Sequence, residues 1–206
     1  MAKTKTVYVC SECGATSVKW QGRCSECGEY NTFEEQLSTS AKTTNNTYVS
    51  AIKATPIGEI DTAEETRYKT GMSELDRVLG GGIVKGSLVL LSGDPGIGKS
   101  TILLQICEHI CKEHTVLYVS GEESARQIKI RADRLGVHSN NLLIMTGNDA
   151  MSINSYIETN KPSIVIIDSI QTMSINEISS VPGSLTQVRE CTNLFLRTAK
   201  TLEIPI

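Results

Sequence analysis

A glycine-rich run near the middle of the chain restricts the choice of fold sharply. It reads Gly93-Asp94-Pro95-Gly96-Ile97-Gly98-Lys99-Ser100-Thr101. The run fits the phosphate-loop pattern G-x-x-x-x-G-K-[ST], which requires a strand before it and a helix after it. The apolar run 87–92 precedes it and a helix-like run, 102–114, follows. Glycines let backbone N–H groups face phosphate oxygens, and a helix N-terminus adds partial positive charge. We therefore predict a nucleotide-binding loop, with an ordinary glycine-rich turn as the alternative.

This loop assigns roles to two side chains that close it. Lys99 is expected to reach the β- and γ-phosphates of ATP, and the Ser100 hydroxyl to bind Mg²⁺. A second signature lies at 163–168, where four apolar residues end in Asp168. A buried strand would present this carboxylate at its carboxyl end, beside the phosphate loop, where it could hold Mg²⁺ through water. The alternative is a strand that merely ends in an aspartate.

Two adjacent carboxylates, Glu122 and Glu123, follow the apolar run 115–120. A carboxylate at the end of the strand next to the phosphate-loop strand can orient the water that attacks the γ-phosphate. We favour Glu122 as this catalytic group and keep Glu123 as the second choice. Either carboxylate could instead cap the N-terminus of the following helix.

Apolar runs alternate with amphipathic runs through the rest of this region. Strands are predicted at 87–92, 115–120, 141–146 and 163–168. Helices are predicted at 73–79, 99–113, 123–135, 149–160 and 186–201. Strands that are apolar throughout, separated by helices, predict an α/β fold with a mainly parallel sheet covered on both faces. The polar stretch 173–186 is long enough to be a functional or mobile loop.

Bulk properties exclude several classes of protein. The formal net charge of −3 rules out a nonspecific polycation, so any nucleic-acid contact needs a local basic patch or an assembled ring or filament. The apolar runs are too short to cross a bilayer, and the first thirty residues lack the apolar core of a signal peptide. We expect a cytoplasmic protein.

Four of the seven cysteines form two C-x-x-C-G units, Cys10/Cys13 and Cys24/Cys27. In a reducing compartment such units indicate metal ligands rather than disulfides. Four thiolates make a closed tetrahedral zinc site, which is structural and can contribute roughly 10–16 kcal/mol of apparent binding free energy. A redox pair or an iron–sulfur centre is the less favoured interpretation. Cys107 and Cys111, four residues apart on one predicted helix, could hold a metal, but without a third ligand they are expected to be small buried apolar residues.

The first 33 residues contain few large apolar side chains, so the metal must supply much of the stability. The candidates for a small core are Val7, Val9, Val18, Trp20, Tyr30 and Phe33. Trp20 has two interpretations of equal weight. It is the largest part of this core, or it is a stacking aromatic on a basic face with Lys3, Lys5, Lys19 and Arg23 that binds nucleic acid or a partner.

The composition divides the chain into three parts. Residues 1–35 form the four-cysteine zinc-ribbon module, and 36–56, rich in Ser, Thr and Asn, are expected to be a flexible linker. Residues 57–206 form the nucleotide domain, which ends in Ile204-Pro205-Ile206, a run like the start of another strand. We therefore expect an N-terminal fragment of a longer protein.

The order of these motifs resembles one bacterial family. The four-cysteine ribbon is followed by Thr70-Gly71, Leu75-Asp76 and Gly80-Gly81-Gly82, then by the phosphate loop, Val119-Ser120-Gly121-Glu122-Glu123-Ser124 and Ile166-Ile167-Asp168-Ser169-Ile170-Gln171-Thr172. This series, from Tyr8 to the last residue, resembles the RadA (Sms) family of RecA-like ATPases in DNA repair.

The resemblance implies a RecA-like ATPase that processes branched recombination intermediates, by helicase or branch-migration activity on DNA, beside a RecA-type recombinase. It implies a hexameric ring, DNA as partner, and ATP, Mg²⁺ and Zn²⁺ as cofactors. It places phosphate and Mg²⁺ on Lys99 and Ser100, the second metal signature on Asp168 and the activating carboxylate on Glu122. It also places a DNA-contacting loop at 175–184. The family's Lys-Asn-Arg-Phe-Gly motif and Lon-protease-like domain are missing from these 206 residues.

Two other functions compete with a DNA-dependent ATPase. A P-loop kinase would need a lid and an acceptor pocket, which no motif marks, and it leaves the zinc ribbon unexplained. A nucleotide-gated binding module of the RecA/KaiC-like class would bind ATP without acting as a motor. Stimulation of ATP hydrolysis by single-stranded DNA distinguishes the motor from the module.

Overall fold

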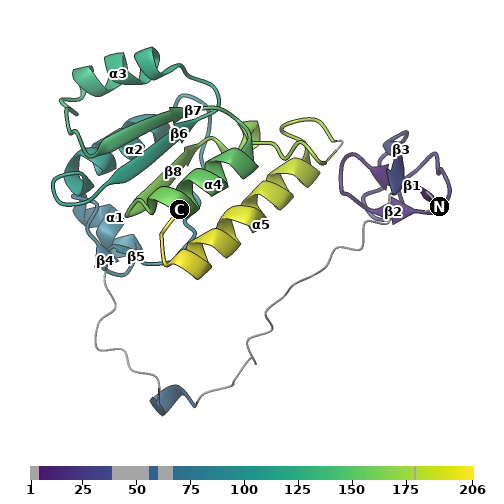
Figure 1. The fold of residues 1–206 in the computed structure, drawn as a ribbon, viewed down its shortest axis with the longest axis horizontal. Helices are drawn as coiled ribbons and strands as arrows, with labels where there is room; N and C mark the ends of the chain where they lie inside the picture. Colours follow the sequence, from purple (N-terminus) through teal and green to yellow (C-terminus); the bar gives the residue numbers. More distant parts are fainter. Residues whose placement is uncertain (1–4, 39–55, 60–66, 179) are drawn as a thin grey trace. The chain divides into compact units, whose positions relative to one another are not determined.

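The computed structural model describes residues 5–38, 56–59, 67–178 and 180–206. The chain divides into two compact units, Met1–Glu65 and Thr66–Ile206, each of which is described by itself (Figure 1). Most of the predicted linker lies outside the described residues. The limits of the three predicted parts therefore remain predictions.

The first unit is a small antiparallel sheet of order β2-β1-β3. Its strands are β1 (Lys5–Cys10), β2 (Thr16–Ser17) and β3 (Phe33–Ser38), and a short 3₁₀ turn, η1 (Ile57–Glu59), lies further along the chain. The buried cluster consists of Cys10, Cys24 and Phe33. The sequence prediction of a larger core was wrong, because Val18, Trp20 and Tyr30 are 82%, 53% and 67% exposed. The cysteines and Phe33 fill the centre, and these three side chains remain outside it.

The second unit has a parallel three-stranded sheet of order β7-β6-β8. These strands are β6 (Val116–Ser120), β7 (Leu142–Thr146) and β8 (Ile164–Asp168). The helices are α1 (Ser73–Val78), α2 (Lys99–Ile110), α3 (Ala125–Arg134), α4 (Ala150–Asn160) and α5 (Leu185–Leu202). A two-stranded antiparallel pair, β4 (Arg67–Tyr68) with β5 (Ile83–Val84), flanks α1, and a 3₁₀ turn, η2 (Ile170–Thr172), follows β8. The predicted helices and three of the four predicted strands are present.

Helices cover both faces of this sheet, as the apolar strands predicted (Figure 1). Successive strand residues point to opposite faces. Tyr118 and Ile166 pack with α2 and α3 on one face, in the first core cluster. Leu117, Val119 and Val165 pack with α4 and α5 on the other face, in the second cluster. The result is a three-layer α/β/α arrangement.

The predicted strand at 87–92 is not a regular strand, and that prediction needs correction. Only two of its residues make sheet-like bonds: Ile206 N donates to Ser87 O (3.0 Å), and Val89 N donates to Ile206 O (2.9 Å). The run is extended, but Ile206 alone supplies its ladder partners among the described residues. Leu90, beyond this contact, is 79% exposed. Regular strand structure needs a continuous row of backbone partners, which local apolarity does not provide.

Candidate nucleotide and metal sites

The phosphate loop joins the extended run 87–92 to the start of α2 at Lys99. Gly96 and Gly98 have φ of 80° and 101°, in the left-handed region that side-chain-bearing residues rarely adopt. A Cβ atom at either position would meet no atom within 4 Å. Glycine is therefore required here by backbone conformation and not by lack of space. Gly98 is also the N-cap of α2, so the loop leads directly into the helix N-terminus.

Lys99 lies over the loop that precedes it. Its Nζ donates hydrogen bonds to the carbonyl oxygens of Gly93 (2.7 Å) and Asp94 (2.9 Å). The ammonium group is thus held at the mouth of the glycine loop. Ser100 and Thr101 follow in the first turn of α2, both half-buried. This arrangement suits the roles predicted for Lys99 and Ser100, whose assignment to phosphate and Mg²⁺ remains a prediction.

Asp168 is the last residue of β8 and is half-buried. Its Oδ2 accepts a short hydrogen bond from the hydroxyl of Tyr118, on the neighbouring strand β6. Tyr118 is paired with Ile166 in the parallel register, so Asp168 lies two residues further along the same face. Burial, with the hydrogen bond to Asp168 and its charge, raises the pKa of Tyr118 well above its ordinary value. The hydroxyl therefore stays protonated and donates.

The sheet brings Asp168 to the same edge as the phosphate loop. Pro205 O accepts from Val165 N of β8 (3.0 Å), and Ile206 bonds to both Ser87 and Val89 in a parallel pattern. The segment 204–206 therefore lies between β8 and the run 87–92, and all three run in the same direction. Their carboxyl ends, which lead to the phosphate loop and to Asp168, lie at one edge. No hydrogen bond or ion pair described for these residues joins Lys99 or Ser100 to Asp168.

Asp168 also lies on the correct face of the sheet for this role. Ile164 and Ile166, which alternate with it along β8, pack with α2 and α3. By the period of two along a strand, the Asp168 side chain emerges on that same face. α2 is the helix that begins at Lys99. Asp168 therefore lies at the same edge of the sheet as the phosphate loop and on the face covered by α2, where phosphate and metal are expected.

The two adjacent carboxylates after β6 have different partners. Glu122 is exposed, and Ser169 Oγ donates a 3.2 Å hydrogen bond to its Oε1. Glu123 is half-buried and forms a short ion pair with Arg131 of α3. Neither carboxylate caps α3, because Ser124 is the N-cap and forms a capping box with Gln127. The alternative of a capping role is therefore wrong for both.

One premise of the Glu122 prediction is also wrong. Strand β6 does not lie next to the run 87–92: its neighbours are β7 and β8. Since β8 and the segment 204–206 come between, Glu122 belongs beside Asp168 and not beside the phosphate-loop run. The Gly121 amide donates to Asp168 O (3.2 Å), which fixes the two strand ends against each other.

A buried glutamine organises the polar segment after η2. Gln187, in the first turn of α5, is 1% exposed. Its Oε1 accepts from Ile175 N (2.9 Å), and its Nε2 donates to the carbonyl oxygens of Ile175 (3.2 Å), Ile178 (3.1 Å) and Ser180 (2.9 Å). The described part of the loop expected to contact DNA is therefore fastened to α5. The sequence alone gave no sign that Gln187 binds the backbone of this segment, because a polar residue near the start of a helix is common.

Tyr118 and Ser169 were also missed by sequence reasoning. Tyr118 lies inside an apolar run and reads as core. It could have been found only by placing it in register with β8, where its side chain shares a face with Asp168. Ser169 stands next to the aspartate, but which side chain it contacts depends on the pairing of β6 with β8.

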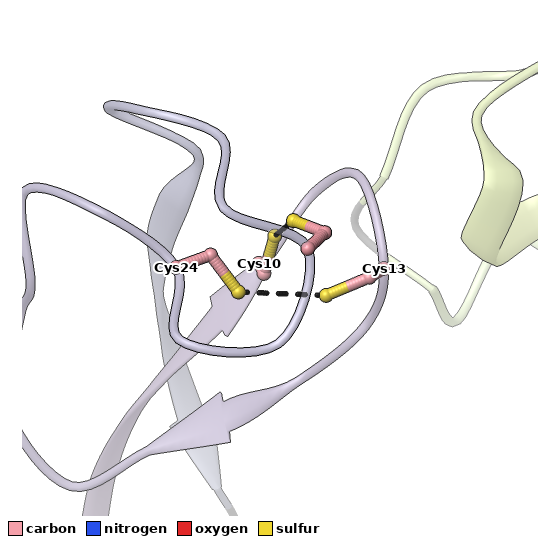
Figure 2. Close-up of side chains that lie close together, drawn as sticks. Cys10, Cys13 and Cys24 are labelled. Atoms are coloured by element: carbon pink, nitrogen blue, oxygen red, sulfur yellow. Dashed lines mark hydrogen bonds between the residues drawn. The ribbon is translucent and has the colours of Figure 1, made fainter.

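The four cysteines of the two C-x-x-C-G units come together in the first unit, and their Sγ atoms all lie within 4.8 Å of one another. Cys13 Sγ is 3.5 Å from Cys24 Sγ (Figure 2). Cys10 Sγ is 3.7 Å from Cys27 Sγ. Tetrahedral zinc with Zn–S distances of about 2.3 Å requires sulfur–sulfur distances of about 3.8 Å. The donor set therefore fits zinc as the sequence predicted. Among the described residues, no other group of three or more such ligands meets these criteria.

The surroundings of Cys10 favour its thiolate. Burial raises the pKa of this thiol, but the Thr32 hydroxyl, 3.2 Å away, and the backbone amides of Cys13 and Glu12 outweigh burial and lower it to about 6. Burial raises the pKa of Cys13 to about 12. A bound cation would favour the thiolate at every position, so metal binding must release protons from the less acidic thiols.

Comparison with known proteins supports both halves of this description. A family model described as KaiC, an ATPase family, matches residues 68–147, and one described as rubredoxin metal binding domain matches residues 8–35. The chain is 48% identical to the DNA repair protein RadA of Bacillus subtilis (strain 168), over 212 residues and 100% of its own length. It is 45% identical to the RadA of Haemophilus influenzae and 43% identical to that of Aquifex aeolicus, again over its whole length.

Over its whole length the chain is similar to proteins named DNA repair protein RadA. Its second unit is a RecA-like P-loop core and its first unit is a zinc ribbon, as the motifs predicted. The chain spans 46% of the length of each of the relatives named above. In the described ranges, no helix combines the length and the apolar character that crossing a membrane requires.

Proposed function

We propose that this chain carries the nucleotide site of a DNA-repair ATPase, which binds ATP with Mg²⁺ and hydrolyses it in response to DNA. The observation that supports the proposal is that the phosphate loop and Asp168 lie at one edge of the sheet. The phosphate loop and Asp168 follow parallel segments there, and Asp168 emerges on the face covered by α2.

Each residue at this edge has a role suited to its surroundings. Residues Gly93–Thr101 hold the phosphates, with Lys99 supplying positive charge and Ser100 a hydroxyl ligand for Mg²⁺. Asp168 holds a hydrated Mg²⁺ from the end of β8. Glu122 orients the attacking water, because it is exposed beside Asp168 while Glu123 is occupied by Arg131.

The wider role follows from the relatives, which are named as DNA repair proteins. We propose that the whole protein processes branched recombination intermediates by helicase or branch-migration activity, as a hexameric ring beside a RecA-type recombinase in the cytoplasm. The zinc ribbon serves as a separate structural module. Single-stranded or branched DNA is the expected partner, with contacts at the loop that Gln187 fastens.

The test compares ATP hydrolysis by the chain with and without single-stranded DNA. Stimulation of hydrolysis by DNA supports the repair ATPase. An equal rate of hydrolysis with and without DNA contradicts the proposal that the activity depends on DNA. Nucleotide binding without hydrolysis favours the nucleotide-gated module, and transfer of phosphate to a small acceptor favours a kinase. Lys99→Ala should remove nucleotide binding or turnover and leave zinc content intact. Lys112→Ala, which removes an exposed lysine beyond α2, is the matched control.

A further inference from the structure

Tyr118 places a polar group inside an otherwise apolar sheet. The side chain is 1% exposed and packs in the cluster that joins the sheet to α2 and α3. Its ring fills core volume, as phenylalanine could. Its hydroxyl, which phenylalanine lacks, donates a hydrogen bond to the Asp168 carboxylate.

We propose that Tyr118 is a positioning residue for the magnesium site, holding one carboxylate oxygen of Asp168 so that the other faces the hydrated metal. This inference rests on the function proposed above and deepens it. Tyr118 itself touches neither nucleotide nor metal and acts through Asp168.

The geometry supports this division of the two carboxylate oxygens. The hydrogen bond described for the Asp168 side chain uses Oδ2. An aspartate side chain at the open end of a strand can rotate about χ1 and χ2, and each orientation presents different oxygens to a metal. A buried donor from the adjacent strand fixes one oxygen, so Oδ1 is left with a defined direction. The donor is itself fixed, since Tyr118 is in the middle of β6 and is surrounded by core residues.

A purely structural role for the hydroxyl makes different predictions. If the bond served only to satisfy a buried polar group, removing it would change stability and leave metal dependence as it was. If it positions Asp168, removing it changes the dependence on Mg²⁺ more than the affinity for nucleotide alone. Measuring these two properties separately distinguishes the roles.

The experiment uses Tyr118→Phe in the whole chain, with Tyr156→Phe on α4 as a control that removes a half-buried phenol hydroxyl elsewhere. Binding of a fluorescent, non-hydrolysable ATP analogue is titrated against Mg²⁺ and repeated in EDTA. We expect Tyr118→Phe to raise the half-saturating Mg²⁺ concentration about 10- to 150-fold, the range for losing a hydrogen bond to a charged group. Affinity in EDTA should stay within about twofold of the unmodified chain.

A double-mutant cycle with Asp168→Asn tests whether the effect passes through Asp168. In the Asp168→Asn background, Tyr118→Phe should have no further effect on Mg²⁺ dependence. Additive effects, or an unchanged Mg²⁺ dependence in the single variant, overturn the positioning role and leave the proposed function standing. Failure of the unmodified chain to bind the analogue with Mg²⁺ overturns the proposed function as well.

A second measurement needs no change at Tyr118. The six tyrosines are labelled with ¹³C at Cζ, whose chemical shift reports the hydrogen bond of the hydroxyl. Asp168→Asn should shift one resonance, and adding Mg²⁺ with the ATP analogue to the unmodified chain should shift the same one. If metal and nucleotide bind and that resonance does not move, the inference is wrong.

Discussion

Ser169 Oγ donates a 3.2 Å hydrogen bond to Glu122 Oε1, which connects the residue after β8 to the carboxylate that follows β6. Ser169 directly follows Asp168, so the proposed metal ligand is adjacent in sequence to the residue that holds the proposed catalytic carboxylate. A shift of either strand end would therefore move both groups together.

The different partners of the two adjacent carboxylates lead to the first prediction. Glu122→Gln should lower the rate of ATP hydrolysis by roughly 100-fold or more, the usual loss when a catalytic base is removed, with little change in nucleotide affinity. Glu123→Gln is the matched control, and it should affect stability by weakening the pair with Arg131. Single-turnover hydrolysis and analogue binding measure the two properties. If Glu123→Gln abolishes turnover and Glu122→Gln does not, the roles are reversed.

The cysteines should separate into two groups by reactivity. With zinc bound, none of the seven should react rapidly with a thiol reagent at neutral pH, and a chelator should expose the four of the cluster. The other three, Cys107, Cys111 and Cys191, are buried and should react only after unfolding. Elemental analysis should find one zinc per chain. Iron in place of zinc, or rapid reaction of more than four thiols in the folded chelated protein, contradicts the assignment.

The raised pKa values of two of these buried thiols lead to a prediction of how alkaline pH changes the free energy of unfolding. Burial raises the pKa of Cys111 and of Cys191 from 9.0 to about 11. Between these values the unfolded chain loses the thiol protons and the folded chain keeps them. The free energy of unfolding should therefore fall as pH rises from about 9 to about 11. Cys111→Ser with Cys191→Ser should flatten this part of the pH profile, measured by denaturant unfolding at each pH. A profile equally steep in the double variant would show that other groups are responsible.

Gln187 should determine the order of the loop it fastens. Gln187→Leu keeps most of the side-chain volume and removes all four hydrogen bonds to the backbone at Ile175, Ile178 and Ser180. We expect a loss of about 2–4 kcal/mol in unfolding free energy and faster exchange of the Ile175 amide. Gln105→Ala, at an exposed position of α2, should change neither. Unchanged exchange at Ile175 would mean that the loop is held by other contacts.

Gly121 should tolerate no larger residue. A Cβ there would lie 2.2 Å from Thr172 Oγ1 and 2.7 Å from Thr172 Cβ, so η2 would have to move away from β6. Because Glu122 follows directly, Gly121→Ala should lower both thermal stability and ATP hydrolysis. Gly58→Ala, where a Cβ meets nothing within 4 Å, is the control. Full activity of Gly121→Ala would show that η2 shifts without disturbing the site.

The sequence predicted those parts of the fold whose signals are local. β8 and α5 were placed well because one is apolar throughout and the other is amphipathic over many turns. The run 87–92 was misjudged because its ladder partner is Ile206, far away in the chain. Trp20 had two interpretations, and its 53% exposure removes it from the core. What fills that core is a cluster of sulfurs, whose grouping follows from the C-x-x-C-G spacing.

The candidate sites also divide into those with local sequence signals and those without them. The phosphate loop and the four cysteines were found from contiguous motifs. Tyr118 and Ser169 were missed because their contacts depend on the register of β6 against β8. A hydrophobicity pattern does not fix that register when both faces of a strand are apolar.

The apolar character of β8 on both faces has one more consequence. Shortening the strand by a single residue would keep a hydrophobic side chain at nearly every interior position, so the sheet could still assemble. The same deletion would turn the terminal carboxylate of Asp168 toward α4 and α5, away from its tyrosine and from the helix that begins at Lys99. The expected product is a folded, stable protein that does not hydrolyse ATP. The exact number of residues in β8 is therefore required by catalysis and not by folding.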